Sequence, residues 1–441
     1  MKTGKQLKLR AKQVHQAGGK LFIVGGAVRD HHMGITPKDV DLCVEGLTIE
    51  QCREIFGKFE PIHPHAPVFS AVIGGIIHEV AFCRDEVSTG KSKQDFSFVI
   101  SSAFIDSLRR DFTFNAMFWD IFGRKLIDFH NGLDDLKNGI LRHVSDKFAE
   151  SPERIFRAAA FVSRFGFVVA DETKALIKNM VANGAVSSIP VEQIWNQGFN
   201  KIFAGKHIQK AVDFMVECGF AHDTIVAMVN TPQDKKWHPE GNVKIHSCLV
   251  AEHMAQNFDS TWGMTKSEAV SIAFAHDMGK IECTFEEDGR VKSPGHADSD
   301  TPLNFLSDIG FPVSMMDIAS TAIKGHMARF ESGSRREVGR WVRKQKNPGF
   351  GISLIIADCM GRDSASHVPQ SVIDAAAVMM SFEEDNSVTP LVDGNEIMTI
   401  RDIKPGKIIG IIKSALIDEQ MAGEITTKDQ AIQFVKEFVA C

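Results

Sequence analysis

Residues 21–43, LFIVGGAVRDHHMGITPKDVDLC, constrain the fold more than any other segment of the chain. Four apolar residues of strand type lead to Gly25-Gly26, where either glycine can adopt the positive φ of a tight turn. Residues 27–33 can then begin a helix, whose first backbone N–H groups and Arg29 would face an anion such as a triphosphate. The segment therefore predicts a strand, a phosphate-binding turn and a helix in succession.

Two carboxylates follow this turn. Polar and apolar residues alternate over Asp39-Val40-Asp41-Leu42, so on a strand the two aspartates would lie on one face. Aligned carboxylates beside a phosphate-binding turn suit two Mg²⁺ ions, because hard cations take oxygen ligands and can bridge a nucleotide during an in-line displacement. The alternative is a surface turn followed by an edge strand with exposed acids, and the spacing alone does not decide between the two.

The length and composition indicate an ordinary globular protein. With 441 residues, 44% of them hydrophobic and 24% charged, the chain has room for about three domains. No apolar run reaches the roughly 18 residues that span a bilayer, and residues 1–20 are too polar for a signal peptide. We therefore expect a cytoplasmic protein with no membrane contact, and no sequence feature indicates a protein partner. The eight cysteines contain no C-x-x-C pair, which predicts reduced thiols.

The charge distribution permits binding to nucleic acid only through local patches. The net charge of −6 argues against general binding to a polyanion. Residues 1–20 carry six lysines and arginines without an acid, and residues 335–346 carry six with Glu337 as the only acid. Either segment could bind phosphates, although a solvated helix face is the alternative for each.

The pattern along the chain changes near residue 145. Mixed strands and helices are expected over about the first 130 residues, including strands on either side of Gly74-Gly75. Residues 84–98 are expected to form a loop, and residues 108–122 a helix or a strand. From Ser151 onward the apolar spacing is almost entirely helical. The predicted domains are therefore 1–145, 146–230, 231–383 and 384–441.

An ordered set of motifs resembles one family, the bacterial tRNA nucleotidyltransferases and poly(A) polymerases of the second class. The match covers nearly the whole chain in order. Its motifs are VGGAVRD (24–30), DVD (39–41), EVAFCR (79–84), RRDFTFNAM (109–117), DFHNGLDDLKNGILRHV (128–144), ESPERIFRAAAFVSRFGF (150–167), HPEGNVKIH (238–246), AHDMGK (275–280), DGNEIM and AGEITTKDQA.

The resemblance implies an α+β fold, in which a mixed β-sheet nucleotidyltransferase head precedes a mainly helical neck, an HD phosphohydrolase domain and a helical tail. It implies template-independent addition of CCA to the 3′ end of tRNA from CTP and ATP. Two alternatives stay open. One is a poly(A) polymerase or an enzyme that adds only part of CCA, and the other is an HD phosphohydrolase whose head only binds RNA.

The resemblance also assigns roles to residues of the head. The two aspartates of the D-x-D pair would hold the catalytic Mg²⁺, the glycine turn with its arginine would meet the triphosphate, and RRDFTFNAM would contact the nucleotide. An arginine fork suits phosphate oxygens and an aspartate suits a ribose hydroxyl. The implied residues are Asp39, Asp41, Gly25, Gly26, Arg29, Arg110, Asp111 and Asn115.

The motif ESPERIFRAAAFVSRFGF corresponds to the helix that selects the incoming base in this family. Its usual form is E-D-x-x-R-x-x-R, to which Glu150, Arg154 and Arg157 conform. Ser151 replaces the aspartate, and Ala160 stands where a further arginine is common. The missing carboxylate removes an acceptor for the base edge, which a serine hydroxyl replaces only weakly. Nucleotide specificity is therefore the least determined property.

A second metal site is implied by the pattern H…HD…D of an HD phosphohydrolase domain. Imidazoles and carboxylates together suit a divalent transition metal such as Ni²⁺, Co²⁺ or Mn²⁺. The implied reaction is hydrolysis of 2′,3′-cyclic phosphates or 2′-phosphates at an RNA end. The implied ligands are His246, His276, Asp277 and Asp358, with His296 and His326 available for a second metal position.

Overall fold

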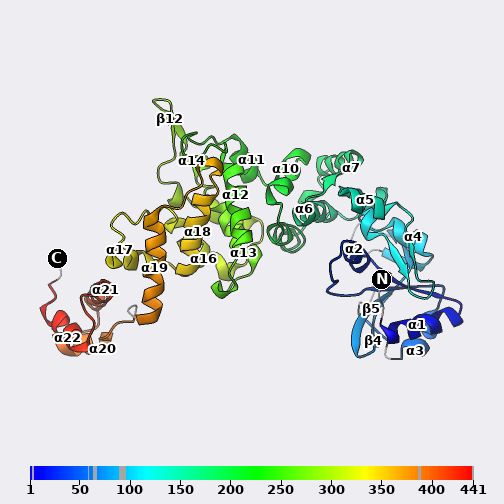
Figure 1. The fold of residues 1–441 in the computed structure, drawn as a ribbon, viewed down its shortest axis with the longest axis horizontal. Coiled ribbons are helices and arrows are strands. Elements are labelled where there is room, and N and C mark those ends of the chain that lie inside the picture. Colours follow the sequence, from blue (N-terminus) through cyan, green and yellow to red (C-terminus); the bar gives the residue numbers. More distant parts are fainter. Residues whose placement is uncertain (2–3, 58, 63–66, 89–95, 386–388, 440–441) are drawn as a thin grey trace. The chain divides into compact units, whose positions relative to one another are not determined.

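The computed structural model describes residues 1, 4–57, 59–62, 67–88, 96–385 and 389–439. The chain forms two compact units, Met1–Pro190 with Glu217–Phe220, and Val191–Val216 with Ala221–Cys441. The first unit contains the main β-sheet and the second is almost entirely helical (Figure 1). This confirms the predicted mixed head followed by a helical remainder, whereas the three predicted domain boundaries stay predictions.

A mixed seven-stranded sheet organises the first unit. Its strand order is β3-β4-β5-β2-β1-β8-β9, in which only β2 and β5 pair in parallel. The strands are β1 Lys20–Val24, β2 Leu42–Glu45, β3 Phe59–Pro61, β4 Val68–Ile73, β5 Ile76–Phe82, β8 Phe118–Asp120 and β9 Lys125–Ile127.

The first strand and turn form as the sequence predicts. The apolar residues of β1 are buried, and Phe22 contacts Phe118 of the neighbouring strand edge to face. Burial on both sides suits the central position of β1 in the sheet. The strand ends at Gly25, whose φ of +64° is readily accessible to glycine. Gly26 does not share this conformation, because it is already the first residue of the next helix.

Helices and two further strand pairs complete the first unit. The helices are α1 Lys5–Gln16, α2 Gly26–His32, α3 Ile49–Phe56, α4 Ala103–Leu108, α5 Gly132–Asn138, α6 Arg154–Phe165 and α7 Asp171–Ala182. The strands outside the main sheet are β6 Arg84–Ser88 with β7 Phe96–Ile100, and β10 Ile140–Leu141 with β11 Val168–Val169.

Two expectations for the first unit are wrong. The ends of the predicted loop 84–98 form the antiparallel pair β6–β7, because backbone pairing does not need an apolar pattern, and residues 89–95 lie outside the described part. Residues 108–122 are neither one helix nor one strand. They form a turn, the 3-10 helix Thr113–Asn115 and then β8, because the polar side chains of this segment bond its own backbone.

The second unit consists of helices and one small hairpin. The hairpin is β12 Phe285–Glu287 with β13 Arg290–Lys292. A π-helix spans Ile194–Phe199. The helices are α8 Val191–Gln193, α9 Asn200–Phe203, α10 Ile208–Cys218, α11 Asp223–Asn230, α12 Val243–Gln256, α13 Lys266–Ala275, α14 Lys280–Cys283, α15 Thr301–Asp308, α16 Met316–Gly325, α17 Arg335–Val342, α18 Pro348–Met360, α19 Gln370–Asp385, α20 Gly394–Arg401, α21 Lys407–Met421 and α22 Lys428–Glu437.

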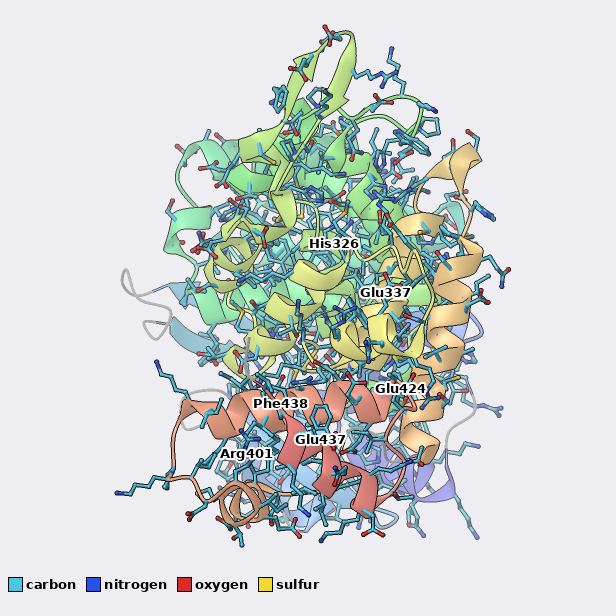
Figure 2. All side chains as sticks on the ribbon, turned by 90° about the vertical axis from the view of Figure 1, so that its left-hand side faces the viewer. His326, Glu337, Arg401, Glu424, Glu437 and Phe438 are labelled. Carbon is cyan, nitrogen blue, oxygen red and sulfur yellow. The ribbon has the colours of Figure 1, made fainter. Side chains whose placement is uncertain are left out.

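The basic segment 335–346 contributes to helix packing. Arg335 donates to the backbone carbonyl of Met421, and Arg336 and Arg343 form ion pairs with α21. In the tail, Arg401 of α20 donates to the carbonyl of Lys436 near the labelled Glu437 and Phe438 (Figure 2). The contacts of Arg335, Arg336 and Arg343 favour an architectural role over the RNA contact that the charge of residues 335–346 alone permitted.

Two further expectations concern the cysteines and the membrane. The seven cysteines in the described part are free thiols, as predicted. Among the described residues, no helix combines the length and the apolar character that crossing a bilayer requires.

Candidate functional site

Three carboxylates meet where β2 begins. Asp39 and Asp41 precede β2 instead of lying on it, which corrects the predicted strand position. The ladder nevertheless extends to this point, because Val24 N–H donates to the Asp41 carbonyl over 3.1 Å. In the parallel pairing Leu42 lies opposite Val80, so the preceding residues, Asp41 and Glu79, lie at corresponding positions.

The electrostatics of this carboxylate cluster favour a cation. Partial desolvation by surrounding atoms, followed by repulsion from Asp39 and Glu79, raises the pKa of Asp41 above its ordinary value. A divalent ion would relieve this repulsion through oxygen ligands. Glu79 was not predicted as a site residue. Its sequence signal was its position in EVAFCR, one residue before the buried Val80 of the strand beside the D-x-D pair.

Two arginines flank the glycine turn. A Cβ atom at Gly25 would lie 3.7 Å from Arg110 Nη1, and one at Gly26 would lie 3.5 Å from Arg29 Nη2. The structure therefore brings both predicted phosphate-binding arginines to the turn. Cationic donors on either side of a tight turn are suited to bind phosphate oxygens.

Arg110 is held by a buried aspartate that the sequence prediction missed. Asp106 of α4 is fully buried, and its two oxygens lie 2.7 Å from Arg109 Nη2 and 2.8 Å from Arg110 Nη2. Burial alone would raise the pKa of Asp106, but the two arginines together hold it below its ordinary value. The i+3 and i+4 spacing of an aspartate before two arginines was the available signal.

Four predicted nucleotide-contacting residues form one chain of hydrogen bonds. Arg29 Nη1 donates to Asn115 Oδ1 over 2.7 Å, and Asn115 Nδ2 donates to Asp111 Oδ1 over 3.1 Å. Arg157 Nε donates to Asp111 Oδ2 over 3.0 Å. The chain joins α2, the 3-10 helix and α6, so it fixes the turn relative to the helix that carries ESPERIFR.

The environment of these hydrogen-bonded residues keeps Asp111 ionised. Burial would raise the pKa of Asp111, yet Arg157 and the hydrogen bonds from Asn115 and from the backbone N–H of Phe112 lower it. Arg29 is 5% exposed and lies 5.3 Å from the ring centres of both Phe161 and Phe165. Asp111 is therefore an ionised acceptor already bound to Arg157.

The predicted base-selecting residues lie on and just before α6. Arg154 donates to the backbone carbonyl of Lys147 over 2.7 Å and also to that of Arg109. The bond to Arg109 directs the Arg154 guanidinium towards RRDFTFNAM. The bonds to Asp111 direct Arg157 to the same motif. Ser151 lies between the preceding 3-10 helix and α6, and Ala160 is buried on the helix.

The predicted HD residues converge in the second unit. The metal-binding atoms of His246, His276, Asp277 and Asp358 lie within 4.8 Å of one another, and all four residues are buried. His246 lies in the first turn of α12, His276 is the C-terminal cap of α13, and Asp358 lies in the last turn of α18. His276 Nε2 has no hydrogen-bond partner among the described residues, which leaves a ligand atom available to a metal.

Asp277 joins this cluster to a second one. Its Oδ2 lies 3.4 Å from His276 Nε2, and its Oδ1 lies 3.1 Å from His296 Nε2 and 3.5 Å from His326 Nε2. His326 follows the last residue of α16 and is labelled in Figure 2. Gly279 permits this arrangement, because a Cβ atom there would lie 2.0 Å from the His296 carbonyl oxygen.

The HD cluster has the charge of a cation site. Burial lowers the pKa of His276, but Asp277 and Asp358 outweigh it and raise the pKa to about 9. The proton on His276 therefore balances the negative charge of Asp277 and Asp358, as a metal cation would. A cavity of about 620 Å³ adjoins the cluster. Its lining includes the cationic or aromatic side chains of Lys236, Trp237, Lys280, Arg329 and Arg362.

Comparisons with known proteins agree with this geometry. Residues 21–142 match the family described as the poly(A) polymerase head domain. Fold and site together therefore define a nucleotidyltransferase. A multifunctional CCA protein of Vibrio vulnificus (strain YJ016) is 36% identical over 421 residues, covering 90% of this chain and 100% of that protein. One from Neisseria gonorrhoeae (strain NCCP11945) is 31% identical over 364 residues, covering 79% and 85%.

The chain belongs to the family of the multifunctional CCA proteins, which are tRNA nucleotidyltransferases. This confirms the resemblance seen in the motifs. The fold agrees with that of the Bacillus stearothermophilus CCA-adding enzyme solved with CTP, at a TM-score of 0.67, 19% identity and coverage of 98% and 96% of the two chains. The Thermotoga maritima CCA-adding enzyme complexed with tRNA gives a TM-score of 0.64 at 20% identity, with coverage of 98% and 95%.

Proposed function

We propose that this chain adds CCA to the 3′ end of tRNA, using CTP and ATP without a nucleic-acid template. The observation that carries the proposal is the carboxylate cluster of Asp39, Asp41 and Glu79 beside a glycine turn flanked by two arginines, in a member of the CCA protein family. We further propose that the reaction takes place in the cytoplasm.

The carboxylate cluster fits Mg²⁺. Asp39 and Asp41 would hold the ions, and Glu79 supplies a third carboxylate next to them. When bound, Mg²⁺ would supply Lewis-acid activation for the RNA 3′-hydroxyl and positive charge for the leaving pyrophosphate. The ladder bond at the Asp41 carbonyl fixes the backbone of Asp41 at the start of β2.

The arginines act on the triphosphate. The RNA 3′-hydroxyl attacks the α-phosphorus and pyrophosphate leaves, so negative charge accumulates on the phosphate oxygens. Arg110 stands at Gly25 with two of its nitrogens bound by Asp106, which leaves Nη1 directed at the turn. Arg29 stands at Gly26 with its Nε and Nη2 held by Asp30 and its Nη1 held by Asn115. Both guanidinium groups are thus oriented in advance to stabilise that charge.

Selection of the base is assigned to α6. Arg154 and Arg157 are three residues apart on one helix and both reach towards RRDFTFNAM. Arg157 binds the Asp111 carboxylate in the described structure, whereas Ser151 carries only a hydroxyl. The selection of C or A would therefore depend on arginine donors more than on a carboxylate acceptor at residue 151.

Incorporation of single nucleotides tests the proposal. Purified protein is incubated with tRNA that ends before its CCA, with CTP, ATP or both, and the products are sequenced. We expect two C residues from CTP alone and complete CCA from both nucleotides. Extension of any RNA by A alone would instead establish a poly(A) polymerase. Absence of incorporation by the wild-type protein would leave the head as an RNA-binding module.

A second activity is proposed for the HD cluster. The four buried ligands and the uncommitted His276 Nε2 fit a divalent transition metal, and His296 with His326 would hold a second ion that shares Asp277. Such a metal supplies an activated water for phosphoester hydrolysis. The cationic cavity supports a phosphate-bearing substrate, and we assign it 2′,3′-cyclic phosphates or 2′-phosphates at an RNA end.

A histidine pair on one helix tests this second activity. H246A removes a ligand, whereas H253A removes a half-buried histidine two turns later on α12 that bonds only Asn257 among the described contacts. With 2′,3′-cyclic AMP and added Co²⁺, H246A should lose hydrolysis and H253A should retain it. Equal activity in wild type and H246A would exclude the HD cluster as the catalytic site.

A further inference from the structure

The four histidines of the HD clusters are not oriented in the same way. His276, His296 and His326 each direct Nδ1 at the backbone carbonyl three residues earlier in the chain, over 2.7, 2.8 and 2.5 Å respectively. His246 differs from them, because its Nδ1 lies 2.8 Å from a carboxylate oxygen, Glu240 Oε1. One of the four imidazoles is therefore supported by a full negative charge and the other three by peptide dipoles.

Glu240 has a buried side chain that contacts a second histidine as well. Its side chain is only 2% exposed, and the same Oε1 lies 2.9 Å from His238 Nδ1. Its other oxygen, Oε2, is buried and has no hydrogen-bond partner in the part of the chain that the structure describes. A buried carboxylate with one unbonded oxygen is costly, so a merely architectural residue at this position would be better replaced by a neutral one.

The contact decides which nitrogen of His246 faces the metal position. Nδ1 has two acceptors, Glu240 Oε1 and, at 3.2 Å, the carbonyl of Gly361, so Nδ1 carries the proton. Nε2 then points to the ligand cluster, where Asp358 Oδ1 lies 2.9 Å away. A carboxylate behind a histidine ligand fixes its orientation and makes its other nitrogen a stronger donor.

We propose that Glu240 is a positioning residue of the HD site, which holds His246 as the Nε2 ligand and makes it the most strongly donating imidazole of the four. The inference rests on the metal site proposed above. It assigns a role to the HPEG sequence that is distinct from metal ligation itself, because Glu240 acts through His246.

Co²⁺ binding to the full-length protein tests this role. The metal is titrated into chelator-treated protein and followed by isothermal calorimetry and by the visible absorption of bound Co²⁺, with H246A defining which signal belongs to the site. E240Q keeps the side-chain size and removes the charge. We expect its Co²⁺ affinity to fall about 10- to 100-fold and its absorption band to shift, with the melting temperature of the metal-free protein showing that it folds.

Two further variants separate charge from packing. E282Q is the matched control, because Glu282 is an exposed carboxylate of the same unit that bonds the hydroxyls of Ser299 and Thr301. E282Q should bind Co²⁺ as wild type does. E240D keeps the negative charge on a shorter side chain and should recover part of the affinity that E240Q loses.

The outcomes distinguish this inference from the metal site itself. An E240Q affinity within about twofold of wild type, or an E240D affinity below that of E240Q, would overturn the role of Glu240 while the metal site stands. Equal weakening by E282Q would also overturn it. A wild-type protein that binds no Co²⁺ would remove the HD metal site and the role of Glu240 together.

Discussion

Neutralising Asp106 should destabilise the first unit and weaken binding of the nucleoside triphosphate. The Asp106 side chain is fully buried and binds two guanidinium groups, each about one sixth exposed at 17%. Removing one partner of a buried ion pair costs about 3–5 kcal/mol. Because both arginines can partly rotate into water, we expect the lower end, about 3 kcal/mol, for D106N.

Calorimetry of the full-length protein measures this effect. The transition of the first unit is the one that CTP shifts upward, since a ligand stabilises the unit that binds it. For a unit of this size about 1 kcal/mol corresponds to about 2–4 °C, so D106N should lower this transition by about 6–12 °C. The Michaelis constant for CTP should rise as well, because Arg110 would no longer be held at Gly25.

The matched control is D134N, which makes the same chemical change at an exposed carboxylate. Asp134 is 74% exposed and lies 3.9 Å from Lys137, so its loss should cost less than about 1 kcal/mol. A D106N transition within about 2 °C of wild type, or a D134N shift of equal size, would refute the assignment of Asp106 as the buried anchor.

The same carboxylate predicts an acid dependence. The pKa of Asp106 in the folded protein lies below its ordinary value of 3.8, so the stabilisation is complete above that pH and is lost as the pH falls through the folded value. The difference between wild type and D106N should therefore be constant from neutral pH to about 5 and diminish only in stronger acid. A difference that grows on acidification would contradict this sign.

Three further changes are expected. E79Q should raise the Mg²⁺ concentration needed for half-maximal CTP incorporation by about 10-fold or more, as a metal titration would show, because it removes one of three clustered charges. S151D should raise the preference for CTP over UTP in competition by about 10-fold, since a charged acceptor would bond the cytosine amino group; an unchanged ratio would separate Ser151 from base selection. Chelator treatment should lower the melting transition of the second unit and added Co²⁺ should restore it, unless the HD cluster binds no metal.

The sequence alone determined the elements whose cause is local. The apolar run before Gly25, the helix after it and the helical spacing beyond residue 151 all formed as predicted, because burial and glycine conformation act within a few residues. The motif order also determined the family. The HD pattern also predicted four residues that lie together in the structure, since a histidine next to an aspartate after an apolar helix is an unusual arrangement.

Only the tertiary structure decided which side chains act on which. Glu79 reaches Asp41 through the parallel register of β2 and β5, which no local pattern specifies. Asp111, expected at a ribose, is bound by Arg157 from a helix 46 residues away in the chain. Glu240 lies behind His246 because a turn folds back on a helix. Long-range pairing depends on how whole elements pack, so the segment 21–43 predicted a phosphate turn while the fold supplied the residues that complete it.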